Sequence, residues 1–268
     1  MQSNEISEKE FEFAFDHELI NFVGEDNIEV YMPTAAREAQ EAFDDRFYVG
    51  NPVIYTSLFF QFKKAFAYRN RNSVCGDPLE YHSGTKLKYE LHKQRYPDFH
   101  SQHNILKDLS DNEDSVFYAS PSIIYRKDLL DQVRGHTLLN SSWIFNLRNF
   151  PRLQSNDNST HAVYYPDSGT VGYFCSDLKE IPRTEITRTI REAKSSYKKQ
   201  DHRREQSEQY LNKLYEKVEK SVMPEYKPKA LINGRKWEDL GTVQKITVVL
   251  ADMFPGLEWI LVYGIEEN

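Results

Sequence analysis

Cysteine is scarce in this chain of 268 residues, and its placement excludes one class of site. The two cysteines, Cys75 and Cys175, stand in no CxxC or Cys/His spacing, and the eight histidines do not gather around either one. A structural zinc site, which needs four such ligands close together, is therefore not expected. A disulfide between the two thiols stays open, but a reduced pair is the favoured interpretation because nothing directs the chain to an oxidising compartment.

Long apolar runs and several common motifs are missing as well. No run approaches the roughly 18 apolar residues that a membrane-spanning helix needs. The first residues are acidic and lack the basic-then-apolar pattern of an export signal. The sequence contains no Walker A loop, no GxGxxG fingerprint and no GxSxG elbow, so nucleotide-driven, dinucleotide-binding and serine-hydrolase roles lack support. We expect a cytoplasmic protein without a membrane partner.

Aromatic residues and unevenly distributed charge are what the sequence does have. The 17 Tyr and 16 Phe suit sheets and broad packing surfaces. A net charge of −7 argues against a protein that coats nucleic acid by bulk attraction. Residues 1–45 carry thirteen acids and two bases, whereas residues 61–107 carry nine bases and four acids. A local phosphate-binding face is therefore compatible with the overall sign.

The pattern of apolar residues predicts an α/β protein with a central mixed sheet flanked by helices. Strands are expected at residues 28–31, 46–49, 53–63, 115–120, 143–145, 161–165 and 172–174. Helices are expected near residues 34–42, 87–96, 103–109 and 125–133. Residues 6–22 fit either a strand or a short helix. We assign residues 1–182 to one α/β domain and residues 183–268 to a helical extension with a small C-terminal cap.

The extension contains a long polar stretch, residues 184–223, with two separate apolar stripes. The stripes consist of Ile186, Ile190, Ala193 and Tyr197, and of Leu211, Leu214, Val218 and Val222. The polar residues between them form either a solvated helix or a turn between two helices. Because both stripes are hard to bury within one small domain, residues 184–223 are predicted to bind a second copy or a partner subunit. A helix near residues 240–253 and an extended segment at 257–265 would form the cap.

The residues most suggestive of chemistry lie between Glu38 and Lys63. Glu38 falls in a predicted helix, and Asp44 comes where the next strand is expected to start. Gln61 and Lys63 come at the end of a later, apolar strand. Side chains two residues apart on a strand share a face, so Gln61 and Lys63 are expected to point together, with Phe62 turned into the core.

Such a set of side chains suits the hydrolysis of a phosphodiester. Asp44, the Gln61 side-chain carbonyl and Glu38 offer the oxygen ligands that a hard cation such as Mg²⁺ or Mn²⁺ prefers. The cation would activate a water molecule and stabilise the charge that builds on the phosphoryl group. A neighbouring lysine, Lys63, can help to deprotonate the water or stabilise the same charge.

This stretch resembles the PD-(D/E)xK superfamily of nucleases, in the form where Gln replaces the usual acid. The E-x(5)-D helix end falls on Glu38 and Asp44, and the Q-x-K strand end falls on Gln61 and Lys63. The resemblance spans residues 15–175 and implies a restriction-endonuclease-like core that cleaves nucleic acid with Mg²⁺, DNA rather than RNA. Proteins of the Q-x-K form are similar to effectors of bacterial anti-phage systems, and the resemblance implies that context too.

Other interpretations of the same residues stay open. Asp45 can replace Asp44, and Glu41 can replace Glu38, because the pattern does not determine the register. Gln61 and Lys63 also fit an ordinary polar strand edge with a snorkelling lysine. A second class of function is a non-catalytic binding or assembly subunit that keeps the nuclease fold and uses residues 184–223 to hold its partner.

Further candidates are weaker. Lys86, Lys88, Lys93 and Arg95 are interleaved with Tyr81, Tyr89 and Tyr96, which fits a nucleic-acid groove or, equally, a solvated amphipathic helix. His161 precedes an apolar strand, where a hydrogen-bonded core histidine is favoured over a catalytic one. Ser120 lies next to Pro121 outside any nucleophile elbow, so a nucleophilic role is not expected.

Overall fold

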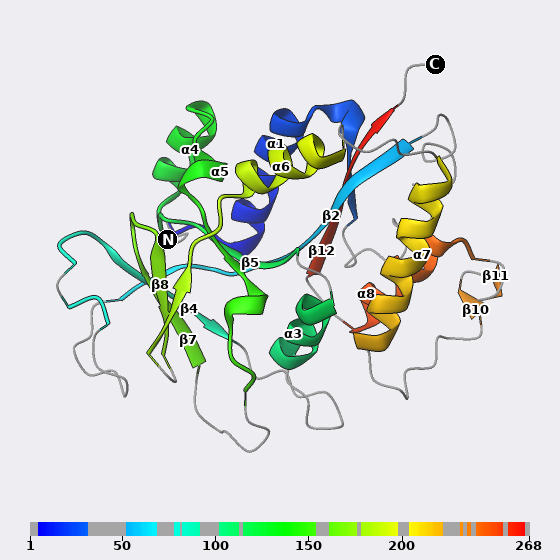
Figure 1. Ribbon diagram of the computed structural model, residues 1–268. Helices are drawn as coiled ribbons and strands as arrows, with labels where there is room; N and C mark the ends of the chain where they lie inside the picture. The colour runs from blue at the N-terminus through cyan, green and yellow to red at the C-terminus, as the bar shows by residue number, and fades with distance from the viewer. Residues whose placement is uncertain are drawn as a thin grey trace. The chain divides into compact units, whose positions relative to one another are not determined.

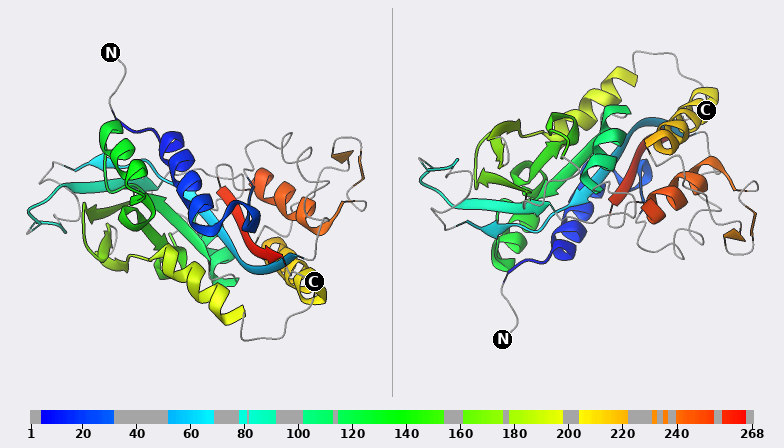
Figure 2. Two further views of the ribbon diagram at one scale, coloured as in Figure 1. Left: turned by 90° about the horizontal axis from the view of Figure 1, so that it is seen from above. Right: turned by 90° about the horizontal axis from the view of Figure 1, so that it is seen from below.

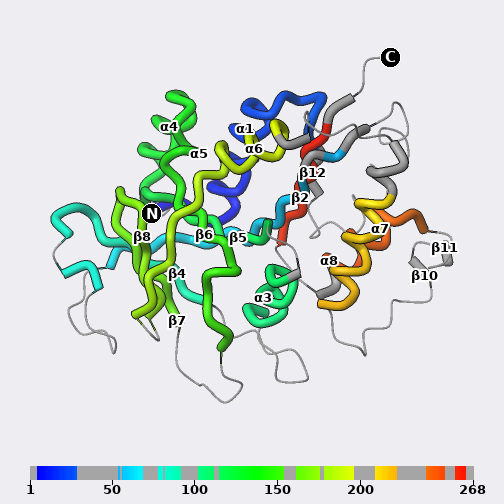
Figure 3. Tube along the Cα trace, in the orientation of Figure 1, coloured from blue at the N-terminus to red at the C-terminus, as the bar shows by residue number. Residues whose placement is uncertain are grey.

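The computed structural model describes residues 5–31, 52–68, 78–80, 82–91, 102–112, 115–153, 161–175, 178–197, 204–221, 231–232, 235–236, 240–253 and 257–265. Figure 1 labels most of their helices and strands, and Figure 3 follows the Cα trace. The chain forms two compact units, each assembled from separate stretches. Unit 1 comprises Met1–Phe22, Gln61–Lys107 and Phe117–Thr189, and unit 2 comprises Val23–Phe60, Asp108–Val116 and Ile190–Asn268. The division between residues 182 and 183 that the sequence suggests stays a prediction.

The first sheet has five strands in the order β1-β12-β2-β5-β6. These strands are β1 (Ile28–Tyr31), β12 (Leu257–Ile265), β2 (Pro52–Phe62), β5 (Val116–Ser120) and β6 (Trp143–Asn146). β1 runs antiparallel to β12, and β5 antiparallel to β6. The Phe59 N–H donates to the Ser115 carbonyl and the Lys63 N–H to the Ala119 carbonyl, both at 2.8 Å. Residue numbers thus increase together along β2 and β5, which makes this pair parallel and the sheet mixed, as predicted.

The second sheet lies within unit 1 and is antiparallel, in the order β3-β4-β7-β8-β9. Its strands are β3 (Phe66–Ala67), β4 (Lys86–Leu91), β7 (His161–Pro166), β8 (Val171–Phe174) and β9 (Lys179–Pro182). The predicted pairing of residues 161–165 with residues 172–174 is confirmed. The helix predicted from residue 87 is wrong over β4. Alternate residues Leu87, Tyr89 and Leu91 are buried there, which is the period of a strand, and β7 pairs with its backbone.

The helices of the described residues confirm several predictions. They are α1 (Glu8–Val23), α3 (Gln102–Asn112), α4 (Arg126–Arg134), α5 (Leu138–Ser141), α6 (Ile186–Tyr197), α7 (Arg204–Ser221) and α8 (Thr242–Met253). Short 3-10 turns follow at η1 (Glu25–Asn27) and η2 (Leu147–Asn149), and β10 (Leu231–Ile232) pairs with β11 (Arg235–Lys236). Predicted helices near 103–109, 125–133 and 240–253 correspond to α3, α4 and α8. The helix predicted at 34–42 and the strand at 46–49 lie outside the described residues.

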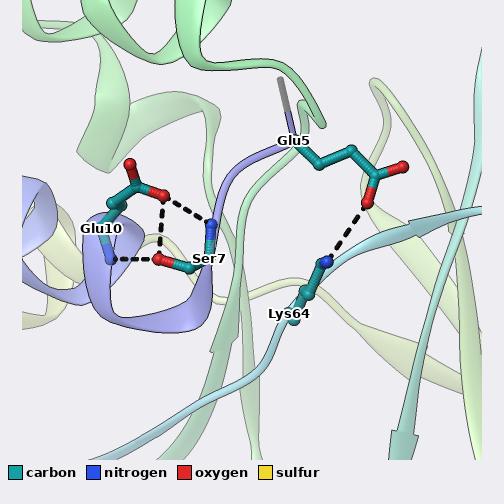
Figure 4. A network of polar contacts seen from close by, with 4 residues as sticks. All are labelled: Glu5, Ser7, Glu10 and Lys64. Carbon is teal, nitrogen blue, oxygen red and sulfur yellow. Dashed lines mark hydrogen bonds and ion pairs between the residues drawn. The ribbon is translucent and has the colours of Figure 1, made fainter. Parts of the chain in front are cut away.

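The N-terminal stretch, which the sequence leaves open between strand and helix, is the helix α1. Its start is a capping box: the Ser7 N–H donates to the Glu10 carboxylate at 2.8 Å, and the Glu10 N–H donates to Ser7 Oγ at 3.1 Å (Figure 4). Phe11 and Phe15 are buried one turn apart, whereas Phe13 between them is exposed. This helical spacing overrides the short Phe11–Phe15 alternation. α1 is the dark blue helix in Figure 2.

Glycine at position 172 in β8 is required by close packing. A Cβ built there would lie 2.8 Å from two ring atoms of Phe145 and 3.1 Å from the Tyr164 carbonyl oxygen. Gly172→Ala is therefore expected to lower the free energy of unfolding by about 1–3 kcal/mol, because a packed core resists an added methyl group. Chemical denaturation checks this. Gly135→Ala is the control, since the nearest atom is 3.3 Å away at φ −83°, and equal losses would contradict the packing argument.

The predicted stretch 184–223 contains two helices, α6 and α7. In the first stripe, Ile186 and Ile190 are buried and Ala193 is partly exposed. In unit 2, Leu214 and Val218 of α7 are buried, and α7 packs against α8. The chain itself therefore covers much of the apolar surface that motivated a partner-binding role. Assembly through residues 184–223 stays a prediction without that support.

Two further findings concern cysteine and membranes. Cys175, in unit 1, is disulfide-bonded, so the expectation of a reduced pair is wrong. The chain has one other cysteine, Cys75, which lies outside the described residues. Thiol pairing depends on spatial proximity, which residues this far apart in sequence do not reveal. Among the described helices, none has both the length and the apolar character needed to span a bilayer.

Candidate active site

The end of β2 delivers Gln61 and Lys63 to the interior of unit 1. The backbone of Lys63 is held on both sides by β5: its N–H donates to the Ala119 carbonyl at 2.8 Å, and its carbonyl accepts from Ser120 Oγ at 3.0 Å. Ser120 Oγ also lies 2.6 Å from the Tyr165 hydroxyl. Ser120 is thus a buried side chain whose hydrogen bonds hold the strand end.

Gln61, Phe62 and Lys63 are all buried, with 6%, 1% and 6% of their surface exposed. The Phe62 ring meets the rings of Phe11 and Phe15 edge-on at 5.7 and 5.4 Å, so the prediction that Phe62 turns into the core is confirmed. Burial of both side chains does not fit a polar strand edge with a snorkelling lysine, whose ammonium would lie in water.

Lys63 is a buried cation with an aromatic ring as its neighbour. Its Nζ lies 5.4 Å from the centroid of the Tyr118 ring, a cation–π contact. Burial lowers the pKa of Lys63 to about 8, and the carboxylate of Glu8 on α1 opposes this shift. An amine with this pKa gives up its proton at a lower pH than an exposed lysine does.

Tyr118 is in turn bonded to a buried histidine of α3. His103 Nδ1 lies 3.0 Å from the Tyr118 hydroxyl, and His103 Nε2 lies 2.9 Å from the Pro151 carbonyl. Burial lowers the pKa of His103 to about 4, so the ring is neutral near pH 7. The Pro151 carbonyl can only accept, which assigns the proton to Nε2 and leaves Nδ1 to accept from Tyr118.

Lys64 provides a direct contrast to its neighbour Lys63. It is partly exposed and pairs with the carboxylate of Glu5 at 3.2 Å (Figure 4). Its Nζ also lies 5.2 Å from the centroid of the Phe66 ring. The two lysine side chains therefore separate, because Lys63 enters the interior and Lys64 lies at the surface.

The acidic members of the predicted site, Glu38 and Asp44, lie outside the described residues, as do the alternatives Glu41 and Asp45. Of the predicted oxygen ligands, the described part of the chain therefore contains Gln61. Within that part, no group of three His, Cys, Asp or Glu side chains is arranged to hold a metal.

The candidate nucleic-acid groove of interleaved lysines and tyrosines falls partly on β4. Tyr89 is fully buried between other aromatic rings, and Lys88 pairs with Glu90 at 2.6 Å on the opposite side of β4. Tyr89 therefore cannot stack on a nucleotide base. Lys86 lies at the start of β4 and is partly exposed, whereas Tyr81, Lys93, Arg95 and Tyr96 lie outside the described residues.

The sequence interpretation missed His103 and Tyr118 as part of this site. Tyr118 lies in a correctly predicted strand, but only the parallel pairing of β2 with β5 brings it to Lys63. His103 lies in a correctly predicted helix and carried no motif. His161, buried with its ring 5.8 Å from Phe174 and nearly parallel to it, agrees with the favoured interpretation of a core histidine.

No protein-family model, curated protein or solved structure matches this chain.

Proposed function

We propose that this chain is a metal-dependent nuclease that cleaves phosphodiester bonds in nucleic acid, DNA in preference to RNA. The observation that carries the proposal is the placement of Lys63. A lysine is buried at the end of the middle strand of a mixed sheet, its backbone is held by β5, and Gln61 precedes it by two residues. Burying an ammonium group is costly, so a protein that only needed a strand end would place an apolar residue here.

Of the predicted metal ligands, Gln61 is a described residue, whereas Glu38 and Asp44 lie outside the described residues. Gln61 is a neutral oxygen donor, which is compatible with a hard cation but contributes no charge. Glu38 and Asp44 would supply that charge. A bound Mg²⁺ or Mn²⁺ would lower the pKa of a coordinated water and polarise the phosphoryl oxygen.

Lys63 would act beside the reacting phosphate. Its ammonium can stabilise the negative charge that develops on the phosphoryl oxygens, and as an amine it can accept a proton from the attacking water. Burial strengthens the first effect, because charges interact more strongly where water is excluded. The effector role in a defence complex belongs to the same proposal and follows from the resemblance in sequence.

Metal dependence tests the proposal directly. The purified protein is expected to cleave plasmid or single-stranded DNA with Mg²⁺ or Mn²⁺ and to stop when EDTA is added, because Gln61 and Asp44 supply oxygen ligands for a hard ion. Gln61→Glu should retain cleavage and reach half of its maximal rate at a lower Mg²⁺ concentration, because the added charge strengthens metal binding. In Gln61→Leu, added Mg²⁺ should no longer stimulate cleavage.

A second measurement, the melting temperature with added Mg²⁺, tests metal binding without depending on cleavage. Added Mg²⁺ is expected to raise the melting temperature of Gln61→Glu more than that of the wild-type protein, since a ligand that binds the folded state stabilises it. Cleavage that persists in EDTA, or a protein that binds DNA without cutting it under any divalent cation, would show that the proposed reaction is wrong. The latter result would favour a binding subunit.

A further inference from the structure

The position of the Lys63 ammonium depends on more than its own strand. The Tyr118 ring lies under it at 5.4 Å, and Tyr118 is fully buried on the neighbouring strand β5. Burial raises the pKa of the Tyr118 hydroxyl, so this group remains a phenol at any pH where the protein would work. Tyr118 therefore presents an uncharged aromatic face to Lys63 together with an O–H donor that needs an acceptor.

His103 is that acceptor, and its own orientation is fixed. Its Nε2–H donates to the Pro151 carbonyl at 2.9 Å, which turns the lone pair of Nδ1 toward the Tyr118 hydroxyl at 3.0 Å. The His103 ring is packed edge-on against Phe150 at 5.8 Å and nearly parallel to Phe174 at 6.5 Å. Phe150 and Pro151 lie in the segment after η2, and Phe174 lies in β8, so these two segments and Tyr118 of β5 together hold the imidazole in place.

The chain of contacts has a chemical consequence for the lysine. A phenol that donates its proton to a neutral imidazole gains electron density, and a more electron-rich ring attracts an ammonium group more strongly. The same hydrogen bond resists tilting of the Tyr118 ring. Loss of Tyr118 would remove, and loss of His103 would weaken, the one cation–π contact that the Lys63 ammonium makes within the described part of the chain.

We propose that His103 and Tyr118 are positioning residues for Lys63: His103 orients the Tyr118 ring, and that ring holds the Lys63 ammonium in place. Neither residue is among the predicted metal ligands, and neither is required to touch the substrate. The structural part of the inference stands on the contacts alone. Its consequence for the rate rests on the proposed nuclease function. The experiment therefore measures the position of Lys63 and the rate of cleavage separately.

The first measurement is independent of activity. In protein labelled with [¹³Cε]lysine, the ring current of Tyr118 is expected to move the Lys63 ε-methylene signal upfield, and Lys63→Met identifies that signal. Tyr118→Leu should abolish the displacement, and Tyr118→Phe should keep part of it. His103→Leu should reduce it, whereas His103→Gln should restore it, because a glutamine amide can donate to Pro151 and accept from Tyr118 through its two ends.

Tyr89→Phe is the matched control. Tyr89 is also fully buried, its ring lies 5.8 Å from that of Tyr118, and its hydroxyl has no hydrogen-bond partner among the described residues. Removing that hydroxyl should leave the Lys63 signal where it is. A Lys63 signal that Tyr118→Leu and His103→Leu both leave unmoved would overturn the inference.

The second measurement is the steady-state rate of DNA cleavage. Tyr118→Leu is expected to lower kcat about 10- to 100-fold with little change in KM, because a small displacement of a catalytic group is costly while substrate binding is retained. His103→Leu should lower kcat about 2- to 12-fold, the effect of one hydrogen bond, and His103→Gln should recover most of it. A loss in KM alone would overturn the positioning role. Signal changes as expected in a protein that never cleaves DNA would support positioning and refute the nuclease proposal.

Discussion

Replacing Lys63 with methionine is expected to lower the rate of DNA cleavage by about 10²–10³-fold, equivalent to roughly 2.7–4 kcal/mol of lost transition-state stabilisation. The expectation follows from burial, because a positioned ammonium in a water-excluded site stabilises developing negative charge far better than an exposed one. Methionine is chosen over alanine because Lys63 is buried beside the Tyr118 ring, where a truncated side chain would leave a cavity. Cleavage kinetics and a denaturation curve, measured together, separate lost chemistry from lost stability.

Lys64→Met is the matched control, since Lys64 is the next residue and pairs at the surface with Glu5. An exposed ion pair contributes little to stability, so this variant should fold as the wild-type protein does. Because Lys64 is not part of the proposed site, the variant should cut DNA within about twofold of the wild-type rate. The same contrast is expected between Asp44→Asn and Asp45→Asn if Asp44 is the ligand, and it inverts if the register is displaced by one residue. Equal, small effects from all four substitutions in a protein that cuts DNA would place the active site elsewhere.

The second large effect concerns stability in acid. Burial lowers the pKa of His103 to about 4, from an ordinary value near 6.5. Below about pH 6.5, His103 binds a proton in the unfolded chain, whereas in the folded protein it stays neutral until the pH approaches 4. The free energy of unfolding is therefore expected to fall by about 3 kcal/mol across that window from this residue alone, and by no more below it. Above pH 7 both states carry neutral imidazole and the effect disappears.

Chemical denaturation at a series of pH values between 7.5 and 4 measures this slope. His103→Gln, which has no titrating group, should flatten the profile relative to the wild-type protein by about the same amount. Carboxylates with lowered pKa, such as Asp167 beside Thr85 and His82, destabilise both proteins alike as the pH falls further, so the difference between the two profiles isolates His103. Parallel profiles would mean that the pKa of His103 in the folded protein is close to its ordinary value, which would contradict the prediction.

Several elements were predicted from local sequence alone, and they share a physical reason. β2 was expected at residues 53–63 and is observed at Pro52–Phe62, because apolar and β-branched residues follow a turn signal there. The helices α3 and α4 and the strands β5, β6, β7 and β8 were found on the same grounds. Each depends on a repeat of apolar residues along a few consecutive positions.

The errors also share a reason. The segment 87–91 was expected in a helix, although its two-residue alternation is clear once β7 supplies a partner. Residues 6–22 are not among these errors, since the sequence leaves them open between strand and helix, and the capping box of Ser7 and Glu10 favours the helix α1. The disulfide at Cys175 and the burial of the α6 and α7 stripes depend on residues that are distant in sequence. Local patterns report which face of an element is apolar and say nothing about what covers it.

At the candidate site, the alternation of adjacent residues is enough to predict a strand that ends near Gln61 and Lys63. The burial of Lys63, its contact with the Tyr118 ring and the hydrogen bond between Tyr118 and His103 depend instead on tertiary contacts. Those neighbours come from β5 and α3, and Pro151 follows η2. Tyr118 meets Lys63 because β2 pairs in parallel with β5, and a parallel pair must be joined by a long connection, which separates the meeting residues in sequence.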